Sequence, residues 1–288
     1  MTNEIFMAWY YALYVDQVAK AGKAEYALPM FINVDLGPAI GEYSSGGALP
    51  IQLNVWQQGA PAIDILAPDI YLPNFAEWCA WYDRSGNPLW IPETRGDAAN
   101  AFYAIGNHAA MGISPFGIER QADASTPLAQ AYGLLAQAAP EILEAQAKGA
   151  IKAISLNAQH PTETVKLGNY SLAFSMGRMR GPAPPAAGAN AQTSSYAIVI
   201  STGPDDYTIL GSGVQATFNG SGPSPAAVGK LEEGTYIDGR WVPGRRLNGD
   251  DIMLNYDAPN KSIKNESGQG FRLAGGAPKA LHLQIYGY

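Results

Sequence analysis

Short, nearly uninterrupted apolar segments alternate with helix-like segments through residues 1–120 of this chain. A strand that is apolar on both sides has to be covered on both sides, which is the condition of a parallel sheet flanked by helices. The first helix candidate shows apolar residues at helical spacing, namely Ile5, Trp9, Ala12, Leu13 and Val18. The candidate strands cover residues 28–34, 63–71, 88–93 and 111–116, and the candidate helices cover 4–20, 49–58, 75–82, 98–108 and 128–148, the last with a kink or break at Pro140.

The second half of the chain has a different pattern, in which short β-rich runs are separated by Gly, Pro, Asn and Asp. Turn signals such as Asn219-Gly220 and Asp238-Gly239 predict antiparallel hairpins, and the whole pattern predicts a β-sandwich or a comparable module. The segment 181–192, rich in Pro, Ala and Gly, is expected to be a mobile surface loop. The candidate strands cover residues 152–156, 170–174, 195–201, 206–210, 213–218, 229–237, 240–246, 252–255, 270–274 and 279–285.

The two halves also differ in charge. Residues 1–150 contain 6 Lys and Arg against 15 Asp and Glu, a net charge of −9, whereas residues 151–288 contain 12 against 10, a net charge of +2. The net charge and the pattern of predicted helices and strands both change near Gly149. We therefore expect two domains, an α/β domain over 1–150 and an all-β domain over 151–288.

The composition excludes several classes of protein. With 47% hydrophobic and 15% charged residues, the chain can bury a core and is not disordered, and its net charge of −7 argues against binding nucleic acid. The single cysteine, Cys79, excludes a disulfide framework, and the three histidines lack metal-ligand spacing, so we expect neither a metal nor another cofactor. The apolar run 6–15 is too short to span a membrane, and the chain as written predicts an intracellular protein. A longer precursor with a secretion signal would instead place it in the periplasm or outside the cell.

Polar residues follow each of the four candidate strands of the first half. In a parallel α/β sheet, functional groups gather at these carboxyl ends. The strongest signal is Glu93 directly after an apolar strand, because two carboxylates about 5 Å apart can cleave a sugar bond with retention. The structural alternative is that Glu93 caps the next helix or pairs with Arg95. The four tips read Asn33-Val-Asp35, Asp69-Ile-Tyr71, Glu93-Thr-Arg95 and Phe116-Gly-Ile-Glu119, and no nucleotide-binding glycine motif follows any strand.

Several longer motifs resemble the bacterial β-galactosidases of glycoside hydrolase family 35, in the subgroup with an extra C-terminal β-domain. The resemblance is strongest over residues 5–150 and weaker over 151–288, where it lies chiefly in 234–250. The motifs that carry it are Ala8-Trp-Tyr-Tyr-Ala-Leu-Tyr-Val-Asp, Gly22-Lys-Ala-Glu-Tyr-Ala-Leu-Pro-Met, Ala67-Pro-Asp-Ile-Tyr-Leu-Pro-Asn-Phe, Ile91-Pro-Glu-Thr and Ser114-Pro-Phe-Gly-Ile-Glu.

The resemblance implies the C-terminal half of a (β/α)8 TIM barrel, with strands equivalent to 5–8, and a retaining mechanism on terminal β-galactosides or related glycans. Glu93 maps onto the family nucleophile, and Tyr71 onto a tyrosine whose hydroxyl can hydrogen-bond it. Asn33 and Glu119 are candidates for binding sugar hydroxyls, and Tyr43 for lining the mouth of the site. The alternatives without a functional role are core packing of the aromatic ring for Tyr71 and loop or capping roles for Asn33 and Glu119.

The resemblance also shows a departure, since the family's acid/base glutamate, in an Asn-Glu pair, belongs to barrel strands that this chain does not carry. Asn3-Glu4 repeats the dipeptide, but we interpret Glu4 as a helix-start carboxylate. On this interpretation the chain is a fragment with impaired activity. Half a barrel exposes strand edges and apolar surface, which predicts a homo-oligomer or a second chain that supplies the missing half.

Two other readings remain open. The first is a non-catalytic carbohydrate-binding or structural fragment, and the second is an unrelated hydrolase, for which no G-x-S-x-G motif is found. His108 falls late in a candidate helix, where a solvated position facing the helix dipole is expected. Four tryptophans are candidates for stacking on sugars, although core packing is expected for most of them, namely Trp56, Trp78, Trp81 and Trp90.

Overall fold

The computed structural model describes residues 2–37, 45–121, 123–177, 195–220, 226–253, 256–257, 262–263 and 269–287. It divides into two compact units: unit 1 comprises Met1–Asp97 and His108–Glu119, and unit 2 comprises Ala98–Asn107 and Arg120–Tyr288. The helical segments 98–107 and 127–148 therefore group with the strands of the second half, because they pack on one of its sheets. The two compact units do not test the domain boundary expected at 150/151, which stays a prediction. The expected loop 181–192 lies outside the described residues.

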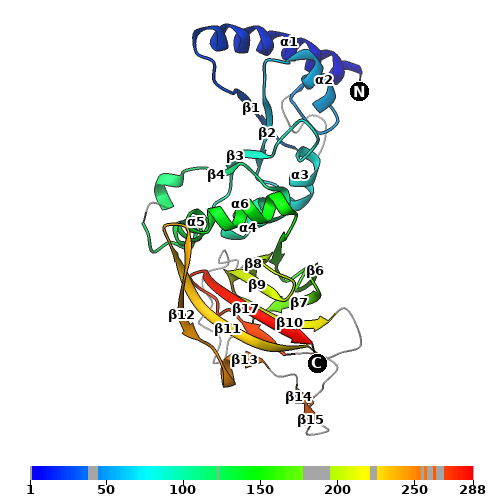
Figure 1. The fold of residues 1–288 in the computed structure, drawn as a ribbon. Coiled ribbons are helices and arrows are strands. Elements are labelled where there is room, and N and C mark those ends of the chain that lie inside the picture. Colours follow the sequence, from blue (N-terminus) through cyan, green and yellow to red (C-terminus); the bar gives the residue numbers. More distant parts are fainter. Residues whose placement is uncertain are drawn as a thin grey trace. The chain divides into compact units, whose positions relative to one another are not determined.

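Unit 1 is built on a four-stranded parallel sheet whose strands follow the order of the chain, β1-β2-β3-β4 (Figure 1). Parallel neighbours need crossover connections, and helical segments of the chain separate the strands. The predicted parallel sheet is confirmed. Its elements are α1 (Thr2–Glu25), β1 (Phe31–Asp35), α2 (Leu53–Gly59), β2 (Ile65–Ile70), α3 (Phe75–Tyr82), β3 (Trp90–Thr94), β4 (Gly112–Pro115) and the 3-10 turn η1 (Ile118–Gln121).

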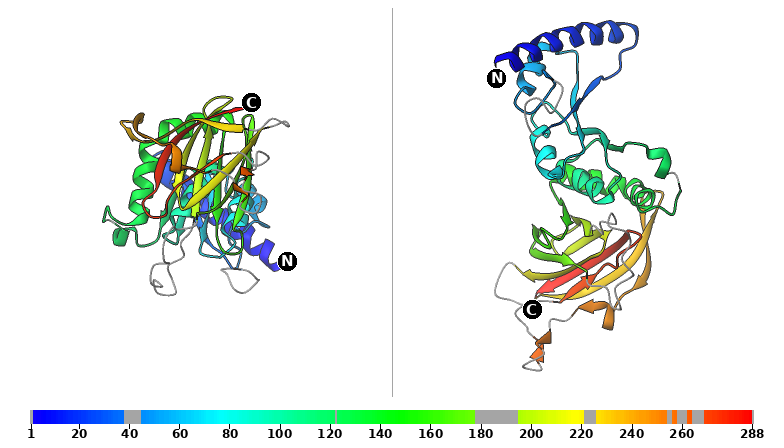
Figure 2. Two further views of the ribbon diagram at one scale, coloured as in Figure 1. Left: turned by 90° about the horizontal axis from the view of Figure 1, so that it is seen from below. Right: turned by 180° about the vertical axis from the view of Figure 1, so that it is seen from behind.

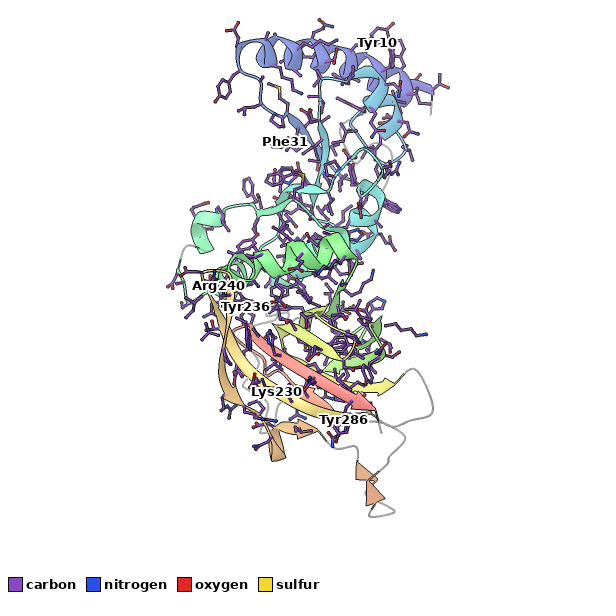
Figure 3. The ribbon with its side chains drawn as sticks, viewed as in Figure 1. Tyr10, Phe31, Lys230, Tyr236, Arg240 and Tyr286 are labelled. Atoms are coloured by element: carbon purple, nitrogen blue, oxygen red, sulfur yellow. The ribbon has the colours of Figure 1, made fainter. Side chains whose placement is uncertain are left out.

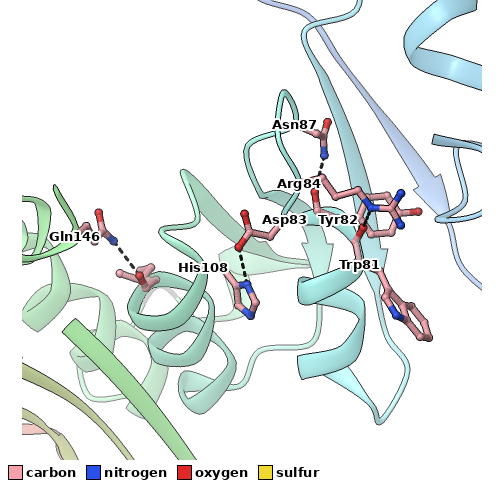
Figure 4. Close-up of polar contacts among 8 residues, drawn as sticks. Trp81, Tyr82, Asp83, Arg84, Asn87, His108 and Gln146 are labelled. Atoms are coloured by element: carbon pink, nitrogen blue, oxygen red, sulfur yellow. Dashed lines mark hydrogen bonds and ion pairs between the residues drawn. The ribbon is translucent and has the colours of Figure 1, made fainter. Parts of the chain in front are cut away.

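Buried side-chain hydrogen bonds tie the turn before β3 to β2. The Asn87 amide donates to the carbonyls of Leu66 (3.1 Å) and Tyr82 (2.9 Å), and its oxygen accepts from the Leu66 amide (2.8 Å). Close by, the Nδ1 atom of His108 lies 2.9 Å from Oδ2 of Asp83 (Figure 4). His108 is therefore held by a carboxylate, and the expectation of a solvated histidine is wrong.

Helix α1 is inverted relative to an ordinary surface helix, because it buries carboxylates and alanines and exposes aromatics. Most of the apolar residues whose spacing predicts the helix are exposed, and Phe6, Tyr10 and Tyr14 are 58%, 56% and 68% exposed. Figure 3 labels Tyr10 on this helix. The buried Asp16 carboxylate accepts a hydrogen bond from the Ala62 amide (2.9 Å), which compensates for its loss of contact with water. The buried residues recur at intervals of three and four: Glu4, Ala8, Ala12, Asp16 and Ala19.

Unit 2 contains two large antiparallel sheets, of five and six strands, with a separate two-stranded ribbon. The five-stranded sheet has the order β13-β16-β10-β7-β6, and the six-stranded sheet has the order β12-β11-β17-β9-β8-β5. Figure 2 shows the strands from two further sides. The strands are β5 (Ile151–Leu156), β6 (Thr162–Leu167), β7 (Tyr170–Met176), β8 (Ser195–Ser201), β9 (Asp206–Ser212), β10 (Val214–Gly220), β11 (Ala226–Ile237), β12 (Arg240–Arg246), β13 (Ile252–Met253), β14 (Tyr256–Asp257), β15 (Ser262–Ile263), β16 (Gly270–Arg272) and β17 (Lys279–Gly287), with the 3-10 turn η2 (Gly249–Asp251) before β13.

The two large sheets share one apolar core, as the sandwich prediction requires. Phe174 and Phe271 come from one sheet and Leu281 from the other, and each is at most 1% exposed. Tyr207 crosses between the sheets, because its hydroxyl donates to the Leu167 carbonyl (2.6 Å) and its ring meets Tyr170 at a centroid distance of 6.4 Å. Fully burying an apolar side chain such as Phe271 or Leu281 stabilises the folded state by about 1.5–3 kcal/mol.

Three helices cover the other face of the six-stranded sheet: α4 (Ala98–His108), α5 (Pro127–Gln137) and α6 (Ala139–Lys148). Phe102 packs against Tyr196 at a centroid distance of 4.7 Å. The Tyr236 hydroxyl donates to Oε2 of Glu141 (2.7 Å), which links β11 to α6. Figure 3 labels Tyr236. Unit 2 is thus a helical layer on a two-sheet sandwich.

The helix boundaries predicted from the sequence can be compared with those in the structure. Helices 75–82 and 98–108 are found as predicted, and the long helix predicted over 128–148 is broken at Ala138, with Pro140 in the first turn of α6. Asn74 precedes α3, where an asparagine often caps a helix, but its side chain makes no cap hydrogen bond. It instead donates to Glu77 and accepts from the indole of Trp78.

Candidate functional site

A hydrogen-bonded carboxylate and phenol lie at the carboxyl end of the unit 1 sheet. Glu93 is the penultimate residue of β3, and Tyr71 is the first residue after β2. The Tyr71 hydroxyl donates to Oε1 of Glu93 over 2.7 Å. Both side chains are half-buried, so the pair is held by protein on one side and remains open to solvent on the other.

Local features of β3 bring Glu93 to this position. The pairing of β3 with β4 shifts register between Ile91 and Thr94, which is the form of a β-bulge. Pro92 lies inside the shift, and it has no amide hydrogen to lose from the ladder. The Thr94 hydroxyl then donates to the Ile70 carbonyl (2.7 Å), which holds the end of β3 against the end of β2. Glu93 is therefore presented by a clamped strand end rather than by a free loop.

The charge state of Tyr71 suits a hydrogen-bond donor. Burial first, and then the bond to Glu93 and the charges of Glu93 and Asp69, raise the pKa of Tyr71 to about 12. Arg95 acts weakly in the opposite direction. The phenol consequently keeps its proton at neutral pH and can hold the Glu93 carboxylate in one orientation.

Asn33 and Asp69 extend the arrangement onto the two neighbouring strands. The Asn33 amide donates to Oδ2 of Asp69 over 2.9 Å. Asp69 pairs with Glu93 in the β2·β3 register and with Asp35 in the β1·β2 register, and paired residues project to the same face of a sheet. Burial first, with further contributions from the charges of Glu93 and Asp35, raises the pKa of Asp69 to about 6 despite the opposing bond from Asn33.

The structure gives less information on the two other predicted site residues, Glu119 and Tyr43. Glu119 lies in η1, after β4, with an exposed side chain. Tyr43 lies outside the described residues. The structure thus joins Tyr71 to Glu93 directly and brings Asn33 to the same row through Asp69, while the roles proposed for Glu119 and Tyr43 stay predictions.

Asp69 is the residue that sequence reasoning left out of the candidate site, although it stands at a strand tip. A usable signal was present, because it precedes Tyr71 by two residues and side chains two apart on a strand share a face. Its burial and its two carboxylate neighbours depend on strand pairing, which the sequence pattern alone does not show.

Glu4 is buried by polar partners. Its carboxylate accepts from the Ser45 hydroxyl (2.7 Å) and the Gly46 amide (3.0 Å). These hydrogen bonds, with a smaller one from Gln52, lower its pKa. A general acid needs a raised pKa, so Glu4 anchors the residue 45–46 turn to the start of α1 and does not suit an acid/base role.

The tryptophans divide between core and surface. Trp56 and Trp78 are 4% and 6% exposed, which confirms core packing for these two, whereas Trp81 is 41% exposed. Trp90 is half-buried and meets Phe31 at a ring-centroid distance of 5.9 Å. Trp81 and Trp90 are therefore the two of the four that remain candidates for sugar stacking.

The fold and the site define a mixed α/β protein with a clamped carboxylate–tyrosine pair at a parallel strand end. Residues 128–257 match the family model described as "Domain of unknown function (DUF5597)", a family known in glycoside hydrolase-like proteins. The match lies within unit 2 and does not include the pair in unit 1. No curated protein matches the chain.

No group of three or more His, Cys, Asp and Glu side chains in the described part of the chain is arranged to hold a metal ion. None of the helices described here combines the length and the apolarity that crossing a membrane requires.

Proposed function

We propose that this chain is a glycoside hydrolase of the β-galactosidase type, acting with retention on terminal β-galactosides, with Glu93 as its nucleophile. The observation that carries the proposal is the 2.7 Å hydrogen bond from Tyr71 to Glu93 at the carboxyl end of a parallel strand. The resemblance to glycoside hydrolase family 35 in the motifs that contain both residues supports it.

The finer architecture belongs to the same proposal. Four parallel strands in chain order are what one half of a (β/α)8 barrel contains, and the active sites of such barrels lie at the carboxyl ends of the strands. We infer that the unit 1 sheet corresponds to barrel strands 5–8. The match of residues 128–257 to a family known in glycoside hydrolase-like proteins supports the proposed class of protein, while the unit 1 sheet lies outside the matched residues.

In the proposed mechanism, a Glu93 carboxylate oxygen attacks the anomeric carbon of the sugar as the bond to the leaving oxygen breaks. This gives a covalent glycosyl-enzyme, which water then hydrolyses. Tyr71 holds the nucleophile in one orientation through its hydrogen bond to Oε1 of Glu93. A nitrophenolate leaves without a proton, whereas an alkoxide needs a general acid that is worth about 10²–10⁴-fold, so we expect slow turnover of lactose.

The test is hydrolysis of nitrophenyl β-galactoside by the wild type and by Glu93→Gln. Loss of the nucleophile is expected to lower the rate by about 10³-fold or more. Glu25→Gln, on the exposed end of α1, is the matched control and should retain the wild-type rate. A 2-deoxy-2-fluoro galactosyl probe should add one sugar to the protein, on the peptide that contains Glu93. Wild-type hydrolysis that survives in Glu93→Gln would overturn the nucleophile assignment.

The second candidate function is carbohydrate binding without catalysis. The observation that favours it is that the carboxyl with a raised pKa beside Glu93 belongs to Asp69, which is only 8% exposed and so is poorly placed to protonate a leaving group. Glycan binding with no turnover of nitrophenyl β-galactoside, and no labelling by the fluorinated probe, would favour this function over hydrolysis.

A further inference from the structure

Three carboxyl groups stand in one row across the first three strands of the unit 1 sheet. Asp35 on β1 pairs with Asp69 on β2, and Asp69 pairs with Glu93 on β3. Neighbouring strands lie about 4.8 Å apart, and paired side chains project to the same face. Asp69 therefore has a carboxyl neighbour on each side, while it is the most buried of the three.

The hydrogen bonds of Asp69 leave a place for a proton. Its Oδ2 atom accepts from the Asn33 amide at 2.9 Å, while its Oδ1 atom is buried without a hydrogen-bond partner in the described part of the chain. An ionised carboxylate with a buried, unpartnered oxygen between two other anions is costly. A protonated Oδ1 removes the charge and turns that oxygen into a donor.

We propose that Asp69 is a positioning residue for Glu93, which acts by holding a proton in the working state of the site so that Glu93 is not repelled from its hydrogen bond with Tyr71. This inference rests on the proposed function of Glu93. It adds a residue that does not touch the substrate and that controls the charge beside the nucleophile.

The groups that interact with Asp69 determine when its proton is lost. They are Asn33 and Asp35 from β1, Glu93 from β3, and two phenols, Tyr71 directly after β2 and Tyr82 from α3. Burial and the two carboxylates raise the pKa of Asp69 to about 6. Above that pH the row carries an additional negative charge, which repels Glu93, and we expect the rate to fall by up to about tenfold per pH unit.

The first experiment compares the pH dependence of kcat for nitrophenyl β-galactoside in three proteins. In Asp69→Asn the side chain stays neutral at every pH, so the ratio of rates at pH 7.5 and 5.5 should rise at least about threefold over the wild type. Asp35→Asn changes the exposed carboxyl of the same row, and it should shift the profile less. An Asp69→Asn profile that parallels the wild type would overturn the proposal.

The second experiment does not depend on activity. Carbon-13 NMR of the carboxyl groups follows the titration of Asp69 in the wild type and in Glu93→Gln. The wild-type midpoint should lie above that of an ordinary aspartate and fall when the charge of Glu93 is removed. An ordinary midpoint in the wild type overturns the role of Asp69 even if the protein hydrolyses galactosides. A raised midpoint that falls in Glu93→Gln, in a protein without hydrolysis, leaves the charge coupling intact and overturns the proposed function instead.

Discussion

At the scale of single residues, the candidate site is a phenol that fixes a carboxylate. Tyr71 is the donor, and its raised pKa keeps the proton on the phenol, so its charge state does not change in the neutral range. Glu93 receives this bond at a strand end that the Thr94 hydroxyl clamps to β2. The orientation of the carboxylate thus depends on one bond that can be removed without altering the backbone.

Tyr71→Phe removes that bond and leaves the ring. A hydrogen bond to a charged group is worth about 1.5–3 kcal/mol, so we expect kcat for nitrophenyl β-galactoside to fall by about 10- to 100-fold. The KM should change less, because the phenol acts on the nucleophile. Tyr26→Phe, at a 72% exposed tyrosine, is the control. A rate for Tyr71→Phe that equals the wild type would show that Glu93 needs no orientation by Tyr71.

At the scale of elements, close contact between the helical layer of unit 2 and its six-stranded sheet depends on small residues. Gly106 on α4 lies against β5 and β8, where a Cβ atom would come within 2.5 Å of the Ala153 Cβ and 3.1 Å of an Ile198 side-chain carbon. Asn107 reinforces the contact, since its amide donates to the Ala153 carbonyl and its oxygen accepts from the Ala153 amide. Gly133 on α5, by contrast, has open space where its Cβ would be.

We predict that the same substitution has opposite effects at these two helical glycines. Gly106→Ala should lower the free energy of unfolding by about 1–3 kcal/mol, because overpacking outweighs the gain in helix propensity. Gly133→Ala should raise it by about 0.5–1 kcal/mol, because it removes backbone freedom without a clash. Urea unfolding followed by circular dichroism measures both. Stabilisation by Gly106→Ala would contradict the close approach of α4 to the sheet.

At the scale of the whole molecule, unit 1 exposes many large apolar side chains, many of them on α1. The exposed side of α1 is aromatic, and β1 and β4 each pair with only one neighbour among the described strands. Unpaired strand edges and contiguous apolar patches are the usual sites of association. The expectation of a homo-oligomer, or of a second chain that completes the sheet, therefore remains our proposal.

We predict that the protein self-associates at micromolar concentration, as measured by size-exclusion chromatography with light scattering. The double substitution Phe6→Lys and Tyr14→Lys places charges on the exposed side of α1 and should shift the protein toward the monomer. Leu143→Lys on α6 is the control, because Leu143 is equally exposed, at 63%, but belongs to unit 2. A monomeric wild type at every concentration tested would contradict self-association, and the partner would then have to be a different chain.

Much of the fold could be predicted because its signals are local. Apolar runs and helical spacing predicted the parallel strands and helices α3 and α4, Pro140 predicted the break before α6, and strand ends predicted Glu93 and Tyr71 as site candidates. Strand β6 was missed, because its one fully buried residue is Val165 and an edge strand shows weak alternation.

The sequence by itself determined which segments form strands and helices and which polar residues stand at the strand ends. Only the tertiary structure decided that Asp69 is buried between Asp35 and Glu93, that Asn33 hydrogen-bonds to it, and that α1 buries Glu4 and Asp16 while exposing its aromatics. The reason is physical: periodicity depends on neighbours along the chain, whereas the burial and charge of a carboxyl depend on groups that strand pairing brings from distant positions.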